Sequence, residues 1–226
     1  MPLSGPGDIT QVRDRLLLSG ADAVTPENVS QHNIGYIINV SQEVAKPDWY
    51  HGDYLQISLT DESSSPLHCW FKRCASTIAH YVNGEPLTPS SAAKSILVHC
   101  LMGISRSASL VLAYLMHQEH CSLRSAYQEL SRLRPSILPN PGFWQQLVNF
   151  ERQLFDSVSV SLTKMPPDLR KNRLKGPAYY QGAVYPSLVW QQARERLAQQ
   201  TLLMDRLRKP MRSKHLQRLR VKLGRK

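Results

Sequence analysis

Residues 95–109, SILVHCLMGISRSAS, constrain the fold more than any other stretch of this chain. An apolar run of strand character ends on Cys100, and a helical pattern begins five residues later. A loop between a strand and a helix N-terminus directs backbone N–H groups at one point, where the helix dipole adds positive potential. Gly103 permits backbone angles that a side chain would resist. The stretch therefore predicts a site for a tetrahedral oxyanion.

Three side chains around this loop have the chemistry to act on a phosphate. Arg106 carries a planar guanidinium that can hold two oxygens at once. A cysteine beside a helix N-terminus and a cation favours the thiolate, so Cys100 is expected to be a nucleophile that attacks phosphorus. The hydroxyl of Ser107 would then stabilise that thiolate as a leaving group in a second step. The pattern predicts covalent catalysis on a phosphate ester.

Other roles for the cysteine have to be weighed against this one. Cys69, Cys74, Cys100 and Cys121 form no CxxC pair, which argues against a zinc ribbon or a thioredoxin-type site. A Cys-x5-Arg spacing alone is weak evidence, and a buried packing cysteine is the plain alternative. A disulfide from Cys69 or Cys74 to an oxidised Cys100 is a further alternative, although helix packing explains both residues more simply. The strand before the loop and the helix after it favour the nucleophile.

The first two thirds of the chain alternates β-branched runs with helical patterns. This order predicts an α/β fold with a central, mostly parallel sheet flanked by helices. Strands are expected in an early pair (ITQV and RLLLSG), then at 36–41, 54–59, 95–100 and 158–164. Helices are expected after the N-cap Thr25 and at 70–82, 105–120, 122–134 and 141–155.

Basic residues collect in the last quarter of the chain. Residues 1–164 hold 12 Lys and Arg against 14 Asp and Glu, whereas residues 165–226 hold 16 against 3. The charge divides the chain into a domain over 8–164 and a basic C-terminal extension over 165–226, partly helical or disordered. The amphipathic patterns at 190–208 and 213–226 would let this extension bind an anionic membrane surface or nucleic acid.

Two further patterns bear on location. No apolar run approaches the ~18 residues that a membrane span needs. The first ten residues lack the basic and apolar regions of a secretory signal, so a cytoplasmic protein is expected. The basic run near the C-terminus is compatible with a nuclear address.

VHCLMGISRSAS resembles the signature of the cysteine-dependent protein phosphatases, specifically their dual-specificity branch. AYLM (113–116), RP (134–135) and PNPGFWQQL (139–147) occur at the spacing of that branch, and the resemblance runs from about residue 8 to residue 155. NFERQLF (149–155) and the VSVSLTKMPPD after it resemble the small atypical members, which lack a separate kinase-docking domain. The resemblance implies a cysteine-phosphatase-like fold and a protein phosphatase that needs no metal or cofactor.

The resemblance also assigns roles within the loop. It implies that Cys100 is the nucleophile, that Arg106 clamps the phosphate, and that backbone amides bind the phosphate oxygens. The residues of this substrate-binding cradle are Leu101, Met102, Gly103, Ile104, Ser105 and Arg106. His99 is implied to order the loop and to favour the thiolate, with a plain core histidine as the alternative. Met102 departs from the family, which usually carries a small residue there, and the departure leaves substrate preference open.

The reaction also needs a proton for the departing oxygen, and a positioned acid typically contributes ~10²–10⁴-fold. The family takes this acid from a loop upstream of the cysteine, at the end of a strand. YLQISL runs into TDESSSP, so Asp61 is expected to be the acid of the first step and the base of the second. Glu62 is the alternative acid, and Asp61 could also be an ordinary loop carboxylate. Asn140 is expected to bond backbone near the cysteine loop, or to be a simple turn residue.

Three substrate classes share this chemistry. Phosphoinositide phosphatases usually carry lysines inside the loop, and LMGIS has none. RNA 5′-triphosphatases would use the basic extension, but the downstream motifs favour phosphoproteins carrying phosphotyrosine and phosphoserine or phosphothreonine. Proteins of the MAP-kinase pathway are targets by family analogy. A different role, as an adaptor that acts mainly through the basic extension, stays open.

Overall fold

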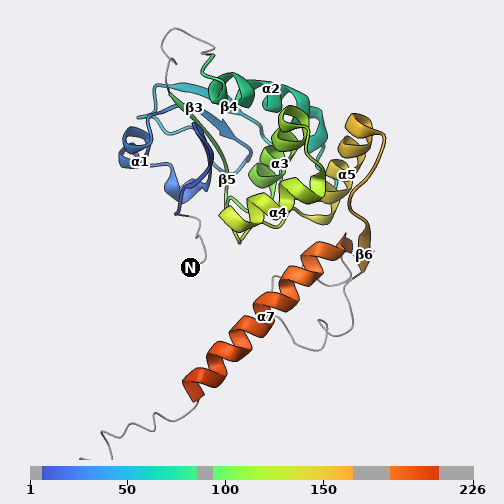
Figure 1. Cartoon of the computed structure of the whole chain (residues 1–226). Helices are drawn as coiled ribbons and strands as arrows, with labels where there is room; N and C mark the ends of the chain where they lie inside the picture. Colours follow the sequence, from blue (N-terminus) through green and yellow to red (C-terminus); the bar gives the residue numbers. More distant parts are fainter. Residues whose placement is uncertain (1–6, 86–93, 165–183, 209–226) are drawn as a thin grey trace, which may run out of the picture.

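The computed structural model of the protein describes residues 7–85, 94–164 and 184–208. A five-stranded sheet in the order β1-β2-β5-β3-β4 runs through its body (Figure 1). The strands are β1 (Thr10–Arg13), β2 (Leu16–Gly20), β3 (Ile34–Asn39), β4 (Asp53–Gln56) and β5 (Ser95–Cys100). In this sheet β1 pairs antiparallel with β2, and the other three pairs are parallel. The α/β fold with a mostly parallel central sheet is confirmed.

Helices cover both faces of this sheet, as buried parallel strands require. They are α1 (Pro26–Gln31), α2 (Phe71–Val82), α3 (Arg106–Glu119), α4 (Leu123–Leu133) and α5 (Pro141–Phe155), with short 3-10 turns at Ala21–Ala23 and Leu67–Trp70. Along β5 the faces alternate: Leu97 joins a small cluster on the α1 side, while Ile96 and Val98 join the large core under the other helices. The strand that ends on Cys100 is thus central.

Helices α2 to α5 begin and end within one residue of their predicted bounds, but two strands of the central sheet differ by more. β3 ends at Asn39 and β4 at Gln56, earlier than the predicted ends at 41 and 59. The Asn39 side chain donates to the carbonyl of Val44 at 2.7 Å and to the hydroxyl of Tyr54 at 2.9 Å, which holds the chain in a loop. Beyond β4, the N–H of Leu59 bonds to the carbonyl of Ile57 in a tight turn.

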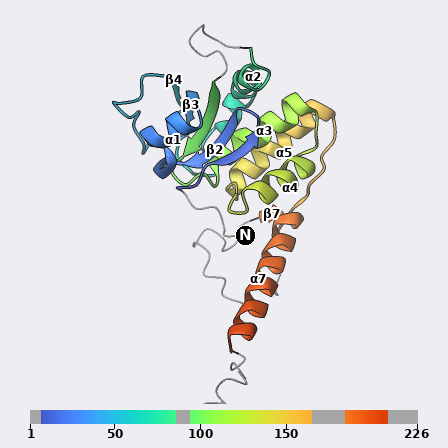
Figure 2. The same ribbon diagram turned by 60° about the vertical axis from the view of Figure 1, so that its left-hand side comes forward.

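The chain beyond residue 183 returns to the body. β6 (Leu162–Lys164), shorter than the strand expected at 158–164, pairs antiparallel with β7 (Val184–Pro186), and α7 (Ser187–Arg208) follows. Tyr185 and Trp190 are buried in the large core, and the Trp190 indole donates to the carbonyl of Thr163 at 3.0 Å. The helix then projects away from the body (Figures 1 and 2). Its first turns are therefore part of the packed domain.

We expect that Trp190→Ala destabilises the protein by about 3–5 kcal/mol, the usual cost of removing a buried tryptophan. The side chain is 2% exposed and packs edge-on against Tyr185 at 5.3 Å between ring centroids. Urea unfolding followed by fluorescence measures the change. Gln191→Ala, at the exposed neighbouring position, is the matched control. Equal midpoints for both variants would show that α7 does not stabilise the body.

The domain boundary predicted after residue 164 remains a prediction, and the basic extension is described only in part. Residues 165–183 and the amphipathic pattern at 213–226 lie outside the described residues. A helix covers 190–208 as predicted. Within the described ranges, no helix is both long enough and apolar enough to cross a membrane.

Candidate active site

The loop after Cys100 is held from its outer side through its carbonyl groups. The carbonyl of Leu101 accepts from the N–H of Ala21 at 3.0 Å, and that of Ile104 from the N–H of Leu138 at 2.9 Å. In a trans peptide the N–H of the next residue points opposite to the carbonyl. Fixing these carbonyls outward therefore turns the following amides inward, toward the cysteine.

Arg134 fixes the middle of the same loop. Its guanidinium donates to the carbonyl of Gly103 at 2.9 Å and to that of Met102 at 3.4 Å. The same side chain bonds to the carbonyl of Asp8 and to the hydroxyl of Thr10, and it is fully buried. Burial lowers the pKa of Arg134, and negative charge on Cys100 opposes that shift. A permanent cation thus lies behind the loop.

Gly103 occupies a position that no other residue fits. Its φ is +66°, in the left-handed region, and a Cβ there would collide with the backbone of Ser19 and Gly20 at the end of β2. The close approach packs the loop onto the sheet. It also brings the Gly103 N–H to 3.3 Å from the Cys100 sulfur.

Cys100 lies at the focus of this arrangement. Its sulfur accepts from the Gly103 amide and, at 3.2 Å, from the Ser107 hydroxyl, which is fully buried. The thiol is 1% exposed. Ser105, the N-cap of α3, makes no side-chain cap bond, so the first amides of that helix are left for an anion. The predicted nucleophile, leaving-group donor and amide cradle meet at one point.

His99 is buried beside the nucleophile and is uncharged at neutral pH. Burial lowers the pKa of His99 to about 4, although a backbone hydrogen bond with Cys100 partly opposes the shift. Its Nδ1 lies 3.3 Å from the carbonyl oxygen of Cys100. His99 thus contacts the loop backbone and supplies no positive charge to the Cys100 sulfur.

This neutral histidine predicts a pH dependence of stability. The unfolded chain protonates His99 near pH 6.5, whereas the folded chain does so only near pH 4. Because the unfolded state binds the proton first, the contribution is lost as pH falls, by about 2 kcal/mol between pH 7 and pH 5. Urea unfolding at the two pH values should show this loss reduced in His99→Asn. An identical loss in both proteins would contradict the prediction.

Arg106 is buried at the start of α3, and Glu43 orients its guanidinium. Its Nη1 donates to the Glu43 carboxylate at 2.6 Å and to the carbonyl of Leu59 at 2.9 Å. Its Nε makes no hydrogen bond within the described residues, with the nearest carboxylate oxygen, of Asp61, at 3.7 Å. Burial raises the pKa of Glu43, but the bonds with Arg106 and the backbone outweigh it and leave that pKa below its ordinary value. Glu43 is therefore an anion that occupies only part of the Arg106 guanidinium, and the remaining N–H groups can bind a phosphate.

Asp61, and not Glu62, is tied to the cysteine loop. One carboxylate oxygen of Asp61 accepts from the Ser105 hydroxyl at 2.7 Å and from the Asn140 amide at 2.8 Å. Both residues are exposed, with the Asp61 side chain 36% exposed, so the bonds to the cysteine loop rather than burial distinguish Asp61 from Glu62. Asn140 also caps α5 by accepting from the N–H of Phe143, and its own N–H donates to Ser105. These bonds support the assignment of Asp61.

The loop that carries Asp61 is docked on α5. Gln146 donates to the carbonyl of Ser65 at 2.9 Å and accepts from the N–H of His68 at 2.8 Å. Gly142 approaches so closely that a Cβ there would collide with the backbone of Ser63. The start of α5 therefore sets the distance between Asp61 and the cysteine loop.

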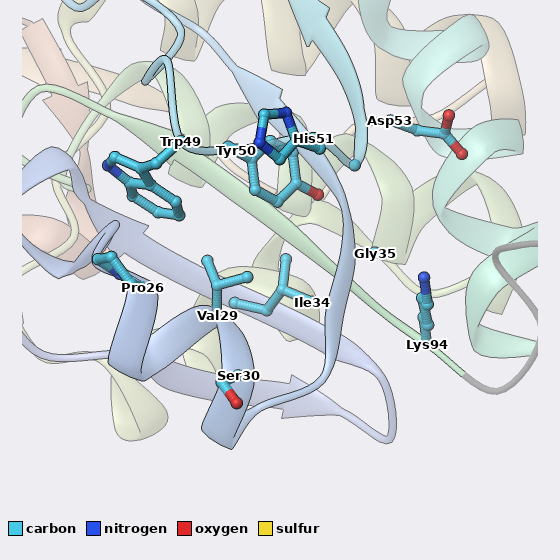
Figure 3. A pocket seen from close by; sticks show the side chains of 11 residues that line it. Pro26, Val29, Ser30, Ile34, Gly35, Trp49, Tyr50, His51, Asp53 and Lys94 are labelled. Carbon is cyan, nitrogen blue, oxygen red and sulfur yellow. The ribbon is translucent and has the colours of Figure 1, made fainter.

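A cavity elsewhere in the molecule is unrelated to this chemistry. It has a volume of about 430 Å³, and Trp49 and Tyr50 face Val29 and Ile34 across it (Figure 3). Lys94, at its edge, precedes β5 and lies at the end of the strand opposite Cys100, about 20 Å away at ~3.3 Å per residue. None of the predicted site residues lines it.

Sequence reasoning missed four residues that build the site: Glu43, Arg134, Gly142 and Gln146. Arg134 and Gly142 lie inside the RP and PNPGFW motifs, which indicate the family but give no sign of the contacts that these two residues make. Glu43 and Gln146 carry no local signal, since they reach the site from other segments of the chain. The alternative of a disulfide to Cys100 gains no support, because all four cysteines are free and Cys74 is buried in the core.

Comparison with known proteins agrees with this geometry. The family model "Dual specificity phosphatase, catalytic domain" matches residues 16–153. Human dual specificity protein phosphatase 14 is 34% identical over 161 residues, which cover 71% of this chain and 77% of that protein. Human dual specificity protein phosphatase 18 is 33% identical over 172 residues, which cover 74% and 87%. The crystal structure of human DUSP28 aligns with a TM-score of 0.59 at 28% identity and covers 68% of this chain and 97% of that chain.

The matched segment spans more than half of the chain and contains Asp61, His99, Cys100, Arg106 and Ser107. Sequence, fold and the arrangement around the cysteine loop agree on one assignment. The chain belongs to the dual specificity phosphatases, as an atypical member of the cysteine-dependent protein tyrosine phosphatase superfamily and hence a protein phosphatase.

Proposed function

We propose that this phosphatase hydrolyses phosphotyrosine and phosphoserine or phosphothreonine in proteins through a cysteinyl-phosphate intermediate. One observation carries the proposal. The Cys100 sulfur accepts bonds from the Gly103 amide and the Ser107 hydroxyl at the uncapped start of α3. Such a place sets a nucleophilic sulfur directly beside a bound phosphate.

In the first step the Cys100 sulfur attacks phosphorus while the bond from phosphorus to the leaving oxygen breaks. Arg106 and the loop amides hold the three remaining oxygens and stabilise the charge that develops on them. Asp61 gives its proton to the departing oxygen, so that an alcohol or phenol leaves rather than its anion. The phosphoryl group is now on sulfur.

In the second step a water molecule attacks phosphorus and gives a proton to the Asp61 carboxylate. The sulfur–phosphorus bond breaks, and its electron pair returns to Cys100. The Ser107 hydroxyl and the Gly103 amide stabilise the leaving thiolate from 3.2 and 3.3 Å. Inorganic phosphate leaves, and Asp61 is again protonated for the next cycle.

Phosphate release from four matched substrates tests the substrate class. The full chain is given a phosphotyrosine peptide, a phosphothreonine peptide, an RNA with a 5′-triphosphate, and a short-chain phosphoinositide. We expect kcat/KM to be highest for the two phosphopeptides, because the loop carries no lysine for a further phosphate. A higher kcat/KM for the RNA or for the phosphoinositide would contradict the proposal and assign that compound class as the substrate.

The cellular partner is a separate question. Proteins of the MAP-kinase pathway are proposed targets by family analogy. Retention of a phosphoprotein by the Cys100→Ser chain in cells would identify the target directly. Binding of the extension to anionic vesicles or RNA can be measured in parallel, with loss of binding on adding salt expected for a charge-driven contact.

A further inference from the structure

Two large apolar side chains stand exposed at the mouth of the site. Leu101 is 42% exposed and Met102 is 45% exposed, directly after the nucleophile. The other strongly exposed large apolar side chains in the described part of the chain are not neighbours in sequence: Trp49, Leu133 and Val158. Leu101 and Met102 are therefore an adjacent apolar pair, and the catalytic steps use their backbone rather than their side chains.

The backbone holds this pair in place. The Leu101 carbonyl is bonded to Ala21, and the Met102 carbonyl accepts from Arg134, which is fully buried. The loop therefore cannot turn these side chains into the core without breaking the bonds that form the cradle. They stay at the surface where the residues next to a bound phosphoresidue must lie.

The opposite rim differs in chemistry. β2 and β3 flank β5 on opposite sides, and Leu101 is bonded to the residue that follows β2. Glu43 and Asp61 follow β3 and β4, with side chains 38% and 36% exposed. The mouth thus has an apolar rim on the β2 side and an acidic rim on the β3 side.

We propose that Leu101 and Met102 form a docking surface for a large apolar residue next to the phosphoresidue of the substrate. This specificity rests on the proposed function. Burying apolar surface from both partners favours such a residue, whereas an acidic neighbour would face the carboxylates of Glu43 and Asp61 across the site. The substrate class is a phosphopeptide with a leucine- or phenylalanine-like neighbour.

The test compares phosphotyrosine peptides that differ at one position. Leucine, alanine or glutamate is placed directly before or directly after the phosphotyrosine, and kcat/KM is measured with the full chain. We expect leucine to exceed glutamate by about tenfold at one of the two positions. The ratio should fall toward one in Met102→Ala and reverse in Met102→Lys. Val158→Ala, which removes a similarly exposed apolar side chain elsewhere, should keep the wild-type ratio.

The outcomes separate the two proposals. Hydrolysis of every peptide with a leucine to glutamate ratio near one, or a preference unchanged in Met102→Ala, overturns the docking surface and leaves the proposed function intact. Failure to hydrolyse any phosphopeptide overturns the proposed function and this specificity with it. Because each ratio is internal to one variant, a change in overall rate cancels from the comparison.

Discussion

Replacement of Cys100 by serine is expected to lower kcat for phosphopeptide hydrolysis by more than about 10⁴-fold, the scale on which covalent enzymes lose activity without their nucleophile. The serine hydroxyl stays protonated at neutral pH, so the helix N-terminus has no anion to direct at phosphorus. Phosphate release from a phosphotyrosine peptide measures the loss. Peptide affinity should persist, because Arg106 and the loop amides remain.

The control for this variant is Cys121→Ser, which changes a free thiol outside the site. Its kcat should stay close to that of the unchanged protein. Substantial turnover by Cys100→Ser, within about tenfold of the unchanged protein, would mean that water attacks phosphorus directly and that the cysteine only binds.

Replacement of Asp61 by asparagine is expected to lower kcat for phosphotyrosine and phosphothreonine peptides by ~10²–10⁴-fold. Asparagine can still accept from Ser105, so the loop is expected to keep its place while losing the transferable proton. The defect should shrink for an aryl phosphate with an acidic phenol, such as p-nitrophenyl phosphate, because that anion leaves without a proton. The dependence of kcat on the leaving group is the measurement.

Glu62→Gln is the matched control for the acid, since Glu62 lies next to Asp61 in the same exposed loop. Its kcat should stay near that of the unchanged protein for every leaving group. A larger loss in Glu62→Gln than in Asp61→Asn would move the acid to Glu62. Equal, leaving-group-independent losses would point to a loop that only positions the substrate.

The catalytic loop could be predicted because its parts are consecutive. Cys100 ends the strand, and Arg106 and Ser107 begin the helix after a short glycine-containing loop. The short loop brings the three residues close together. Asp61 could be predicted for a related reason. It follows the turn after β4, and parallel strands bring their ends to one edge of a sheet. Local pattern therefore sufficed to bring together the residues proposed as nucleophile, clamp and acid.

The support of the site could not be predicted in the same way. Arg134 reaches the loop from the end of α4 and bonds to backbone carbonyls, which every residue carries and no sequence pattern marks. Glu43 meets Arg106 across 63 residues of chain. The strand bounds were also missed where the Asn39 side chain bonds to the backbone and competes with the ladder.

The C-terminal packing was missed because its signals are short. A three-residue strand such as β7 is too brief for its alternation to stand out, and the alternation at 158–164 predicts only its partner β6. The buried faces of Tyr185 and Trp190 become visible only when β7 pairs with β6. The basic composition of residues 165–226 predicted an extension separate from the domain. Tyr185 and Trp190, within that range, instead pack in the core of the body.

The central claim is that phosphate passes through the Cys100 sulfur. Its most direct test mixes the protein with a phosphotyrosine peptide carrying a radiolabelled phosphoryl group and denatures the mixture within milliseconds. After proteolysis we expect the label on the peptide that contains Cys100, and none on the corresponding peptide from Cys100→Ser. Turnover by the unchanged protein without label on that peptide at any quench time, or label on another residue, would contradict the claim.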